Sequence, residues 1–366
     1  MTHKECFHRA AHVLLLVMLV LGLVAIAPAE WKDKVLHSFQ GGTDGAYPPG
    51  GVATDRAGNL YVATNGGGMD KCDCGMVLQL QPPKQKGGDW SENALHSFQG
   101  APDGADPVGG VIFDEAGNLY GTTAYGGIGN CVLIGIRVGC GTVYELSPPA
   151  QKGGPWTETV LYSFPTAKQG YFPWGDLMFD AAGNLYGATQ FGGGHGTTCD
   201  TYYQYCGAVF ELSPPKMKGG KWREKVLHGF AGSPDGAAPN GDLVLDSKGA
   251  VYGTTYLGGK SSCTEVNQHG CGIAFRLMPP AKKGGAWTEM VLHRFQGNTS
   301  DGANPKAGLR FDTAGNLYGT TVECGPLRAG TVFSLSPSSK GNRGGLKLCY
   351  TAFRRAAARA PFRSPA

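Results

Sequence analysis

The chain has 366 residues, of which 60 are Gly, 23 are Pro, 41% are hydrophobic and 16% are charged. This composition is too apolar for a disordered chain and lacks the triplet period of collagen, so it favours many short strands separated by Gly/Pro turns. The formal net charge of +4 is carried by Lys and Arg after residue 339. The rest of the chain is slightly acidic, which excludes an extended nucleic-acid-binding surface.

The N-terminus has the pattern of a secretory signal peptide. Lys4 and Arg9 precede an apolar run at residues 13–26, and Ala27-Pro28-Ala29 supplies small residues before a cleavage site. The alternative is an uncleaved membrane anchor, but the run is shorter than the roughly 20 apolar residues that a membrane helix needs. We therefore expect residues 1–29 to be removed, leaving a secreted or periplasmic protein with no membrane span.

The remaining chain repeats in units of about 65 residues. Each unit contains the tetrapeptide Gly-Asn-Leu-Tyr, which is expected to begin a strand after a tight turn. Gly tolerates a positive φ there, and the Asp before it can accept hydrogen bonds from the N–H groups of the turn. A short first strand is predicted to precede this turn. The five copies begin at Gly58, Gly117, Gly183, Gly249 (as Gly-Ala-Val-Tyr) and Gly315.

Two further strands complete each predicted unit. The third alternates apolar and polar residues and ends at Pro, which cannot donate a hydrogen bond to a neighbouring strand. The fourth runs from a Trp to a Phe, and this pattern already occurs once before the first unit, whereas residues 346–353 after the last unit are only a weak copy. The copies lie at residues 31–39, 90–98, 156–164, 222–230 and 287–295.

Four antiparallel strands per unit, repeated, are typical of a β-propeller blade. We predict an all-β fold: a five-bladed β-propeller of four-stranded antiparallel blades, closed by the N-terminal strand 31–39, because an open ring would leave an unpaired sheet edge. The propeller domain is expected at residues 30–340. Residues 341–366 form a basic tail that we expect to be disordered.

The recurring motifs resemble those of the GloVer tandem-repeat family of exported bacterial proteins. They are Leu-His-Ser-Phe, Asp-Gly-Ala-x-Pro, Phe-Asp-x-Ala-Gly-Asn-Leu-Tyr-Gly-Thr-Thr and Gly-Thr-Val-Phe-x-Leu-Ser-Pro, and they span residues 31–340. The resemblance implies an exported repeat protein and no particular activity. The Asp-x-x-Gly-Asn-Leu-Tyr motif is also similar, less specifically, to NHL and gluconolactonase-type propellers. No anchor of the kind that family members carry is recognised, so free secretion or periplasmic residence is favoured.

In a propeller, the loops after the second and fourth strands emerge on one face, which we expect to bind the ligand. The Asp of each Asp-Gly-Ala loop could contribute oxygen ligands for Ca²⁺, although capping its own turn is the simpler interpretation. Lys168 replaces this Asp in one unit. The four residues are Asp44, Asp103, Asp235 and Asp301.

Cysteines occur in pairs in the loops after the second strands. Removing Cys6 with the signal peptide leaves an even number of the 11 Cys, so disulfides are expected in an oxidising compartment. The spacings do not match zinc-binding clusters. The predicted loop-closing pairs are Cys131/Cys140, Cys199/Cys206 and Cys263/Cys271, whereas the pairing of Cys72, Cys74, Cys324 and Cys349 is left open, a Cys72–Cys74 bridge being disfavoured by their spacing.

Aromatic residues and His offer weaker candidates. Tyr125 and Phe191 precede Gly-Gly in the ligand-face loops and could form platforms for a sugar. The Trp residues that begin the fourth strands are expected to pack between blades. The repeated His of that strand is expected to pack or to hydrogen-bond between blades rather than to bind a metal; it occurs as His37, His96, His228 and His293, with Tyr162 in the remaining copy.

No catalytic motif of the common hydrolase, metalloprotease or nucleotide-binding types is present. We expect a non-enzymatic module that binds a glycan, peptide or cell-envelope component, as a monomer and with no required cofactor. The alternative is a gluconolactonase-like hydrolase or lyase with a divalent cation at the central channel. Glycosidase chemistry would need two nearby carboxylates. The irregular acids on the ligand face are Asp70, Asp73, Asp106, Asp176, Asp200, Glu265 and Glu323, and the sequence does not pair them.

Overall fold

The structure is a computed structural model. It describes residues 33–68, 72–133, 135–151, 153–166, 168–193, 206–217, 219–259, 263, 269–325, 329–337 and 351–352. The predicted signal peptide and nearly all of the predicted tail therefore lie outside the described residues. The chain divides into two compact units, Met1–Ser38 and Phe39–Ala366. Among the described residues, no helix has the length and apolarity that crossing a membrane requires.

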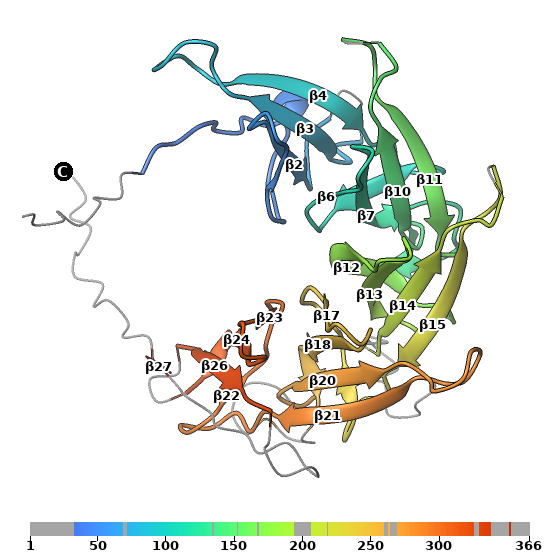
Figure 1. Cartoon of the computed structure of the whole chain (residues 1–366), viewed down its shortest axis with the longest axis vertical. Helices are drawn as coiled ribbons and strands as arrows, with labels where there is room; N and C mark the ends of the chain where they lie inside the picture. Colours follow the sequence, from blue (N-terminus) through green and yellow to red (C-terminus); the bar gives the residue numbers. More distant parts are fainter. Residues whose placement is uncertain are drawn as a thin grey trace, which may run out of the picture. The chain divides into compact units, whose positions relative to one another are not determined.

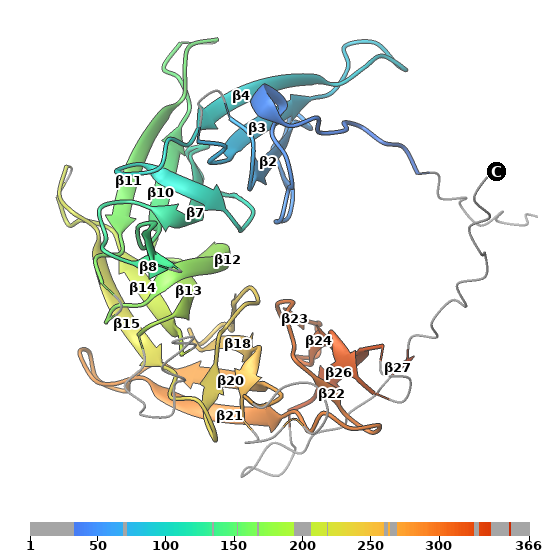
Figure 2. The same ribbon diagram turned by 180° about the vertical axis from the view of Figure 1, so that it is seen from behind.

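The second unit is built from antiparallel sheets whose strands follow one another along the chain. The first sheet has the order β1 (Ala53–Thr54), β2 (Leu60–Thr64), β3 (Met76–Gln81) and β4 (Ser91–Ser97). Figures 1 and 2 show β2, β3 and β4 side by side. These bounds agree with the strands that the repeat predicts, and β3 stops where Pro82 follows, since Pro cannot donate to the neighbouring strand.

The same order recurs in the following units. The second sheet contains β5 (Gly104–Pro107), β6 (Ile112–Phe113), β7 (Leu119–Gly126), β10 (Thr142–Ser147) and β11 (Thr157–Ser163). The third contains β12 (Tyr171–Phe179), β13 (Leu185–Phe191), β14 (Ala208–Ser213) and β15 (Arg223–Gly229). The fourth contains β17 (Val244–Leu245), β18 (Val251–Thr255), β20 (Ile273–Met278) and β21 (Thr288–Arg294). The fifth contains β23 (Arg310–Phe311), β24 (Leu317–Thr321), β26 (Thr331–Leu335) and β27 (Thr351–Ala352).

Short two-stranded pairings and one 3₁₀ helix lie in the loops. The helix η1 covers Gly42–Asp44. The pairings are β8 (Val132–Leu133) with β9 (Ile136–Arg137), β16 (Gly236–Ala237) with β19 (Leu257–Gly258), and β22 (Gly302–Ala303) with β25 (Glu323–Cys324). The last two pairings hold a loop after a second strand close to a loop after a fourth strand, where the sequence places the candidate ligand face, whereas β8 and β9 pair within one loop.

Neighbouring sheets pack through one repeated aromatic contact. The Phe that follows a fourth strand lies edge-to-face against the third-strand aromatic ring of the next sheet, as Phe164 does against Phe210 at 5.3 Å. Both rings are fully buried. Edge-to-face pairs at this separation stabilise beyond the area that they bury. The other pairs are Phe98–Tyr144, Phe230–Phe275 and Phe295–Phe333.

The predicted closing strand is not formed over its described residues. Residues 33–39 have no strand, and Trp31 and Lys32 lie outside the described part. The fourth position beside β26 is held by β27, which pairs with Thr331 and Val332. Thr351 and Ala352 belong to the weak copy at residues 346–353, so the described part of that copy takes the position that sequence reasoning had assigned to residues 31–39.

Candidate functional site

Five residues that each precede a proline share an unusual backbone conformation in the candidate ligand-face loops. Each has a positive φ of 54–57°, which is unusual for a residue with a side chain. The Phe172 amide donates to the carbonyl of Cys140 in the preceding sheet at 3.0 Å. The loop before a first strand is thus fastened to the loop before the third strand of its neighbour. The five residues are Tyr47, Asp106, Phe172, Ala238 and Asn304, and the other acceptors are Cys74 for Asp106, Cys206 for Ala238 and Cys271 for Asn304.

Disulfides close the loops that supply these carbonyls. Cys131 is bonded to Cys140 and Cys263 to Cys271. Cys206 is also disulfide-bonded, and its expected partner Cys199 lies outside the described residues. Cys72 and Cys74 form a disulfide with each other, although their spacing had led us to disfavour this bridge. Disulfides of this number are typical of proteins that fold in an oxidising compartment. Cys349 lies outside the described residues.

The Asp residues of the Asp-Gly-Ala loops each engage their own loop. Asp103 accepts a hydrogen bond from the Gln99 amide at 3.0 Å and lies 3.1 Å from Nε2 of His96. Asp301 likewise accepts from the Gln296 amide and lies 2.9 Å from Nε2 of His293. This local turn capping is the simpler of the two sequence interpretations. Asp44 accepts from the Gln40 amide and Asp235 from the Ala231 amide.

Four aromatic rings from the second and third sheets form one cluster, which we call the aromatic cluster: Tyr125, Tyr171, Phe172 and Phe191. Phe172 lies 4.7 Å from Tyr125 and 5.1 Å from Phe191, both edge-to-face. Tyr171 contacts Phe172 at 4.8 Å and Phe191 at 5.4 Å. Tyr171 and Phe172 are buried, whereas Tyr125 and Phe191 are half-buried and reach solvent. The structure thus brings the two predicted platform residues together.

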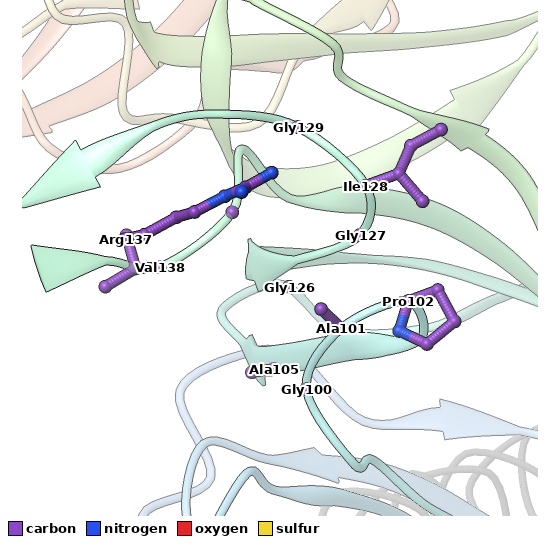
Figure 3. Close-up of a pocket in the computed structure, with 11 residues that line it drawn as sticks. Gly100, Ala101, Pro102, Ala105, Gly126, Gly127, Ile128, Gly129, Arg137 and Val138 are labelled. Carbon is purple, nitrogen blue, oxygen red and sulfur yellow. The ribbon is translucent and has the colours of Figure 1, made fainter.

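A cavity of about 610 Å³ adjoins this cluster. Tyr125 pairs across the sheet with Ala105, and Ala105 lines the cavity. Figure 3 shows the two loops that enclose it, one at Gly100–Pro102 and one at Gly126–Gly129, together with the extended side chain of Arg137. Arg137 donates to Oδ1 of Asn130 and is the single charged residue among those that line the cavity.

A pair of acids, Asp106 and Asp73, lies near Tyr125. Burial, and then the nearby Asp73 carboxylate, raise the pKa of Asp106 to about 6. Burial and Asp106 in turn raise the pKa of Tyr125 above its usual value. A half-buried carboxyl group of this kind can both donate and accept a hydrogen bond near neutral pH. The cluster is therefore bordered by polar groups that could orient a hydroxyl-rich ligand.

Two carboxylates lie at the start of neighbouring first strands; we call Asp176 and Asp242 the inner carboxylates. Asp176 Oδ1 accepts from the Gly110 amide at 2.5 Å, and the Asp176 amide donates to Asp242 Oδ1 at 3.0 Å. Burial, and then the charge of Asp242, raise the pKa of Asp176, while the Gly110 amide and Arg310 oppose the rise. Arg310 lies 3.3 Å from Asp242.

Sequence reasoning found some of these residues and missed others. It named Tyr125, Phe191, Asp73, Asp106 and Asp176 but could not place them together. It overlooked Tyr171, Phe172, Asp242 and Arg137, although a signal was present, because each breaks the repeat: Gly51, Gly110 and Gly308 occupy the position of Asp176 and Asp242 in the other units. Of the remaining irregular acids, Asp70, Asp200 and Glu265 lie outside the described residues.

Comparisons with known proteins agree with the repeat. The sequence pattern of the Gloeobacter/Verrucomicrobia repeat matches residues 22–262 and, in a second overlapping match, 132–363. No curated protein matches the sequence.

Several solved structures overlap most of the chain at low similarity. An α-L-arabinofuranosidase from Clostridium thermocellum is 13% identical, with 83% of this chain and 93% of that chain covered and a TM-score of 0.37. A glucose dehydrogenase is 14% identical, with 84% and 88% covered and a TM-score of 0.43. An inulosucrase from Halalkalicoccus jeotgali is 13% identical, with 81% and 84% covered and a TM-score of 0.41. Overlaps this weak establish neither a shared fold nor a shared activity.

Proposed function

The chain belongs to the Gloeobacter/Verrucomicrobia repeat family, and we propose that it is an exported, non-enzymatic module that binds a carbohydrate. The binding site in this proposal is the aromatic cluster together with the cavity beside it. The observation that carries the proposal is the meeting of Tyr125, Tyr171, Phe172 and Phe191 from two sheets. In the other units the position of Tyr125 holds Gly66, Leu257 or Glu323, so the cluster is particular to one place in a regular repeat.

The chemistry of the site suits a neutral, hydroxyl-rich ligand. Half-buried rings offer apolar faces on which the C–H face of a sugar can stack, and binding sites typically combine such rings with a few polar groups. The guanidinium of Arg137 lines the cavity, and Asp106 lies next to Tyr125. These groups could hydrogen-bond the hydroxyls at the rim. A peptide or another envelope component would meet the same surface and is a possible outcome of the test.

For the architecture, we propose that the repeated sheets are the blades of a five-bladed β-propeller. The recurring edge-to-face contact between consecutive sheets supports this, because it gives every junction the same geometry. We further propose that the segment around Thr351 and Ala352 completes the fifth blade as its fourth strand beside β26. Deleting residues 338–366 should then lower the melting temperature more than deleting residues 30–39; the opposite order would favour closure by the N-terminal segment instead.

The export, the assembly state and the cofactor requirement belong to the same proposal. Residues 1–29 direct export and are removed, and the protein acts as a monomer. Carbohydrate binding needs no cofactor in this proposal, and Ca²⁺ is a candidate only for the Asp-Gly-Ala loops. Chelation with EGTA should therefore leave glycan binding unchanged, and a Ca²⁺-dependent thermal shift that Asp103→Asn abolishes would assign the ion to that loop.

A glycan array with residues 30–366 tests the binding proposal. Tyr125→Ala should weaken binding to the glycans that score by at least about tenfold, because one stacking surface is lost. Tyr47→Ala is the matched control, because Tyr47 is a 78% exposed aromatic residue in the equivalent loops of the first sheet. No binding to any glycan, or equal loss from the two substitutions, would contradict the proposal.

A second candidate function is carbohydrate hydrolysis by the inner carboxylates. Among the five units this position holds Asp only in the third and fourth, as Asp176 and Asp242, and the raised pKa of Asp176 suits a general acid. A glycan that binds should then be cleaved, with release of new reducing ends. Asp176→Asn should lower that rate by about 100-fold or more while binding persists. Binding without cleavage would leave the first function in place and remove the second.

A further inference from the structure

A second set of polar residues recurs at the junctions between sheets, away from the aromatic cluster. At the junction of the first and second sheets, His96 comes from β4, Asp103 from the loop that follows it, and Glu158 from β11 of the next sheet. One ligand atom of each residue lies within 4.8 Å of the other two. His96 and Asp103 are near in the sequence, whereas the packing of the sheets brings Glu158 to them.

The same arrangement is built again two junctions later. His228 comes from β15, Asp235 from the following loop, and Glu289 from β21 of the fourth sheet. Nε2 of His228 lies 3.4 Å from Oδ2 of Asp235, compared with 3.1 Å in the first cluster. We call these two sets the junction clusters. Each contains one imidazole and two carboxyl groups.

Both junction clusters contain buried oxygen atoms without a hydrogen-bond partner. They are Oδ1 of Asp103 and Oε1 of Glu158 in the first cluster, and Oδ1 of Asp235 and Oε1 of Glu289 in the second. Nε2 of His228 is buried without a hydrogen bond as well. Leaving such atoms unpaired is costly, and native proteins normally supply them with a donor, a water or an ion. Oε1 of Glu224 at the junction between them is unpaired as well, so the added Asp oxygen and the imidazole are what set the two junction clusters apart.

The electrostatics of each cluster favour a positive occupant. Burial, and then the nearby Asp103, raise the pKa of Glu158 to about 7, and His96 opposes the rise. Burial and Asp235 similarly raise the pKa of Glu289 to about 7. Two carboxylates in one half-buried space repel each other, and a cation between them would relieve that repulsion.

We propose that each junction cluster binds one divalent transition-metal ion, of which Zn²⁺ is the representative, and that the ion joins two neighbouring sheets. Imidazole nitrogen and carboxylate oxygen are both zinc ligands, and three protein ligands leave a fourth position to water. The function of such an ion is structural, because its ligands come from two sheets.

The chain contains its own control at the junction between the clusters. There Tyr162 takes the place of the His, and the Asp-Gly-Ala motif is replaced by residues 168–170, while the Glu remains as Glu224. The hydroxyl of Tyr162 donates to Oε2 of Glu224 at 3.5 Å. This junction keeps one buried carboxyl group but lacks the nitrogen and the second carboxylate, so it should bind no ion.

The test is calorimetric titration of ZnCl₂ into the untagged, metal-stripped chain of residues 30–366, with bound zinc counted by elemental analysis. We expect Glu158→Gln and Glu289→Gln each to lower the stoichiometry by one ion per chain, and the double variant by two. Glu224→Gln should leave it unchanged. His96→Gln is a second variant for the first cluster, in case Glu158→Gln fails to fold.

Two results would overturn the proposal. One is the same zinc stoichiometry in the parent chain and the two single variants, which would place any bound zinc elsewhere. The other is zinc binding that Glu224→Gln removes as effectively as Glu158→Gln. The middle junction has neither the His nor the Asp of the junction clusters, so its Glu should not contribute to binding. The second cluster should bind more weakly than the first, because the positive charge of Arg294 also acts on Glu289.

Discussion

At the residue scale, one Asp in each unit organises the turn that starts the second strand. In the third sheet, Oδ1 of Asp180 accepts from the amides of Ala182 and Asn184, both at 2.9 Å. Oδ2 accepts from the Asn184 side chain at 2.8 Å and from the Tyr186 hydroxyl at 3.1 Å. The Asn and Tyr of the Asp-x-x-Gly-Asn-Leu-Tyr motif therefore donate hydrogen bonds to its Asp. This structural role explains why the motif repeats, without any functional role.

The ionised form of Asp180 should stabilise the fold. Burial raises the pKa of this carboxyl, but the hydrogen bonds from Asn184, Ala182 and Tyr186 outweigh it, and the pKa lies below its usual value. A lowered folded-state pKa gives stability above the unfolded pKa of about 4, and that stability is lost as the pH falls further. Asp180→Asn should therefore lower the free energy of unfolding by about 1–2 kcal/mol at pH 7. The deficit should shrink between about pH 4 and pH 2.

Urea denaturation at a series of pH values measures this effect. Glu115→Gln is the control, because Glu115 is an exposed carboxylate in the corresponding turn of the second sheet. It should change the stability little. A gap between Asp180→Asn and the parent chain that stays constant from pH 7 to pH 2 would show that the charge of Asp180 has no part in the effect.

At the scale of the element, the loops before the third strands connect neighbouring sheets. The disulfide from Cys131 to Cys140 closes such a loop, and the carbonyl of Cys140 accepts the amide of Phe172 from the next sheet. The residue that donates has a positive φ, so its conformation depends on this contact and on the following Pro. The disulfide therefore acts on the loop itself and on the junction beside it.

Replacing both Cys131 and Cys140 by Ser should lower the free energy of unfolding by about 2–3 kcal/mol, as expected for a closed loop of this length. The amide of Phe172 should also exchange its hydrogen faster, because its acceptor is less constrained. The amide of Asn304, whose acceptor is Cys271 in another loop, should keep its protection. Denaturation together with hydrogen–deuterium exchange measures both effects. If the amide of Phe172 exchanges equally fast in the parent chain and in the variant, the disulfide does not stabilise the contact between the two sheets.

At the scale of the whole molecule, the sheets depend on one another. Each four-stranded sheet leaves apolar faces that only the adjacent sheets cover, and the large clusters of buried residues draw on consecutive sheets. Repeat proteins of this kind gain much of their stability from the interfaces between units. Unfolding should therefore spread from one sheet to the next.

Phe164→Ala tests this dependence. Phe164 is fully buried after β11 and contacts Phe210 in the third sheet. We expect a loss of about 3–5 kcal/mol in the free energy of unfolding, through the cavity that the substitution leaves. A single shifted transition should appear, with lost protection in the fourth sheet as well. Protection that falls only in the second and third sheets would instead indicate that the sheets unfold independently.

The amino-acid sequence by itself determined the local structure. The repeat, the strand limits, the Asp turn and the pairing of Cys131 with Cys140 all depend on residues that are near in the chain, so periodicity and turn chemistry predicted them. The choice between residues 31–39 and 346–353 as a fourth strand was not determined in this way. Both segments carry strand-forming residues, and only the position of β26 beside β27 distinguishes them in the structure.

The tertiary structure alone decided which distant residues meet. Tyr125 and Phe191 were visible as candidates, but Tyr171 and Phe172 complete the cluster only because the second and third sheets pack together. The same holds for Asp176 with Asp242, and for His96 with Glu158. Contacts between units depend on the angle and register of whole sheets, which arise from many small packing energies that no short motif records.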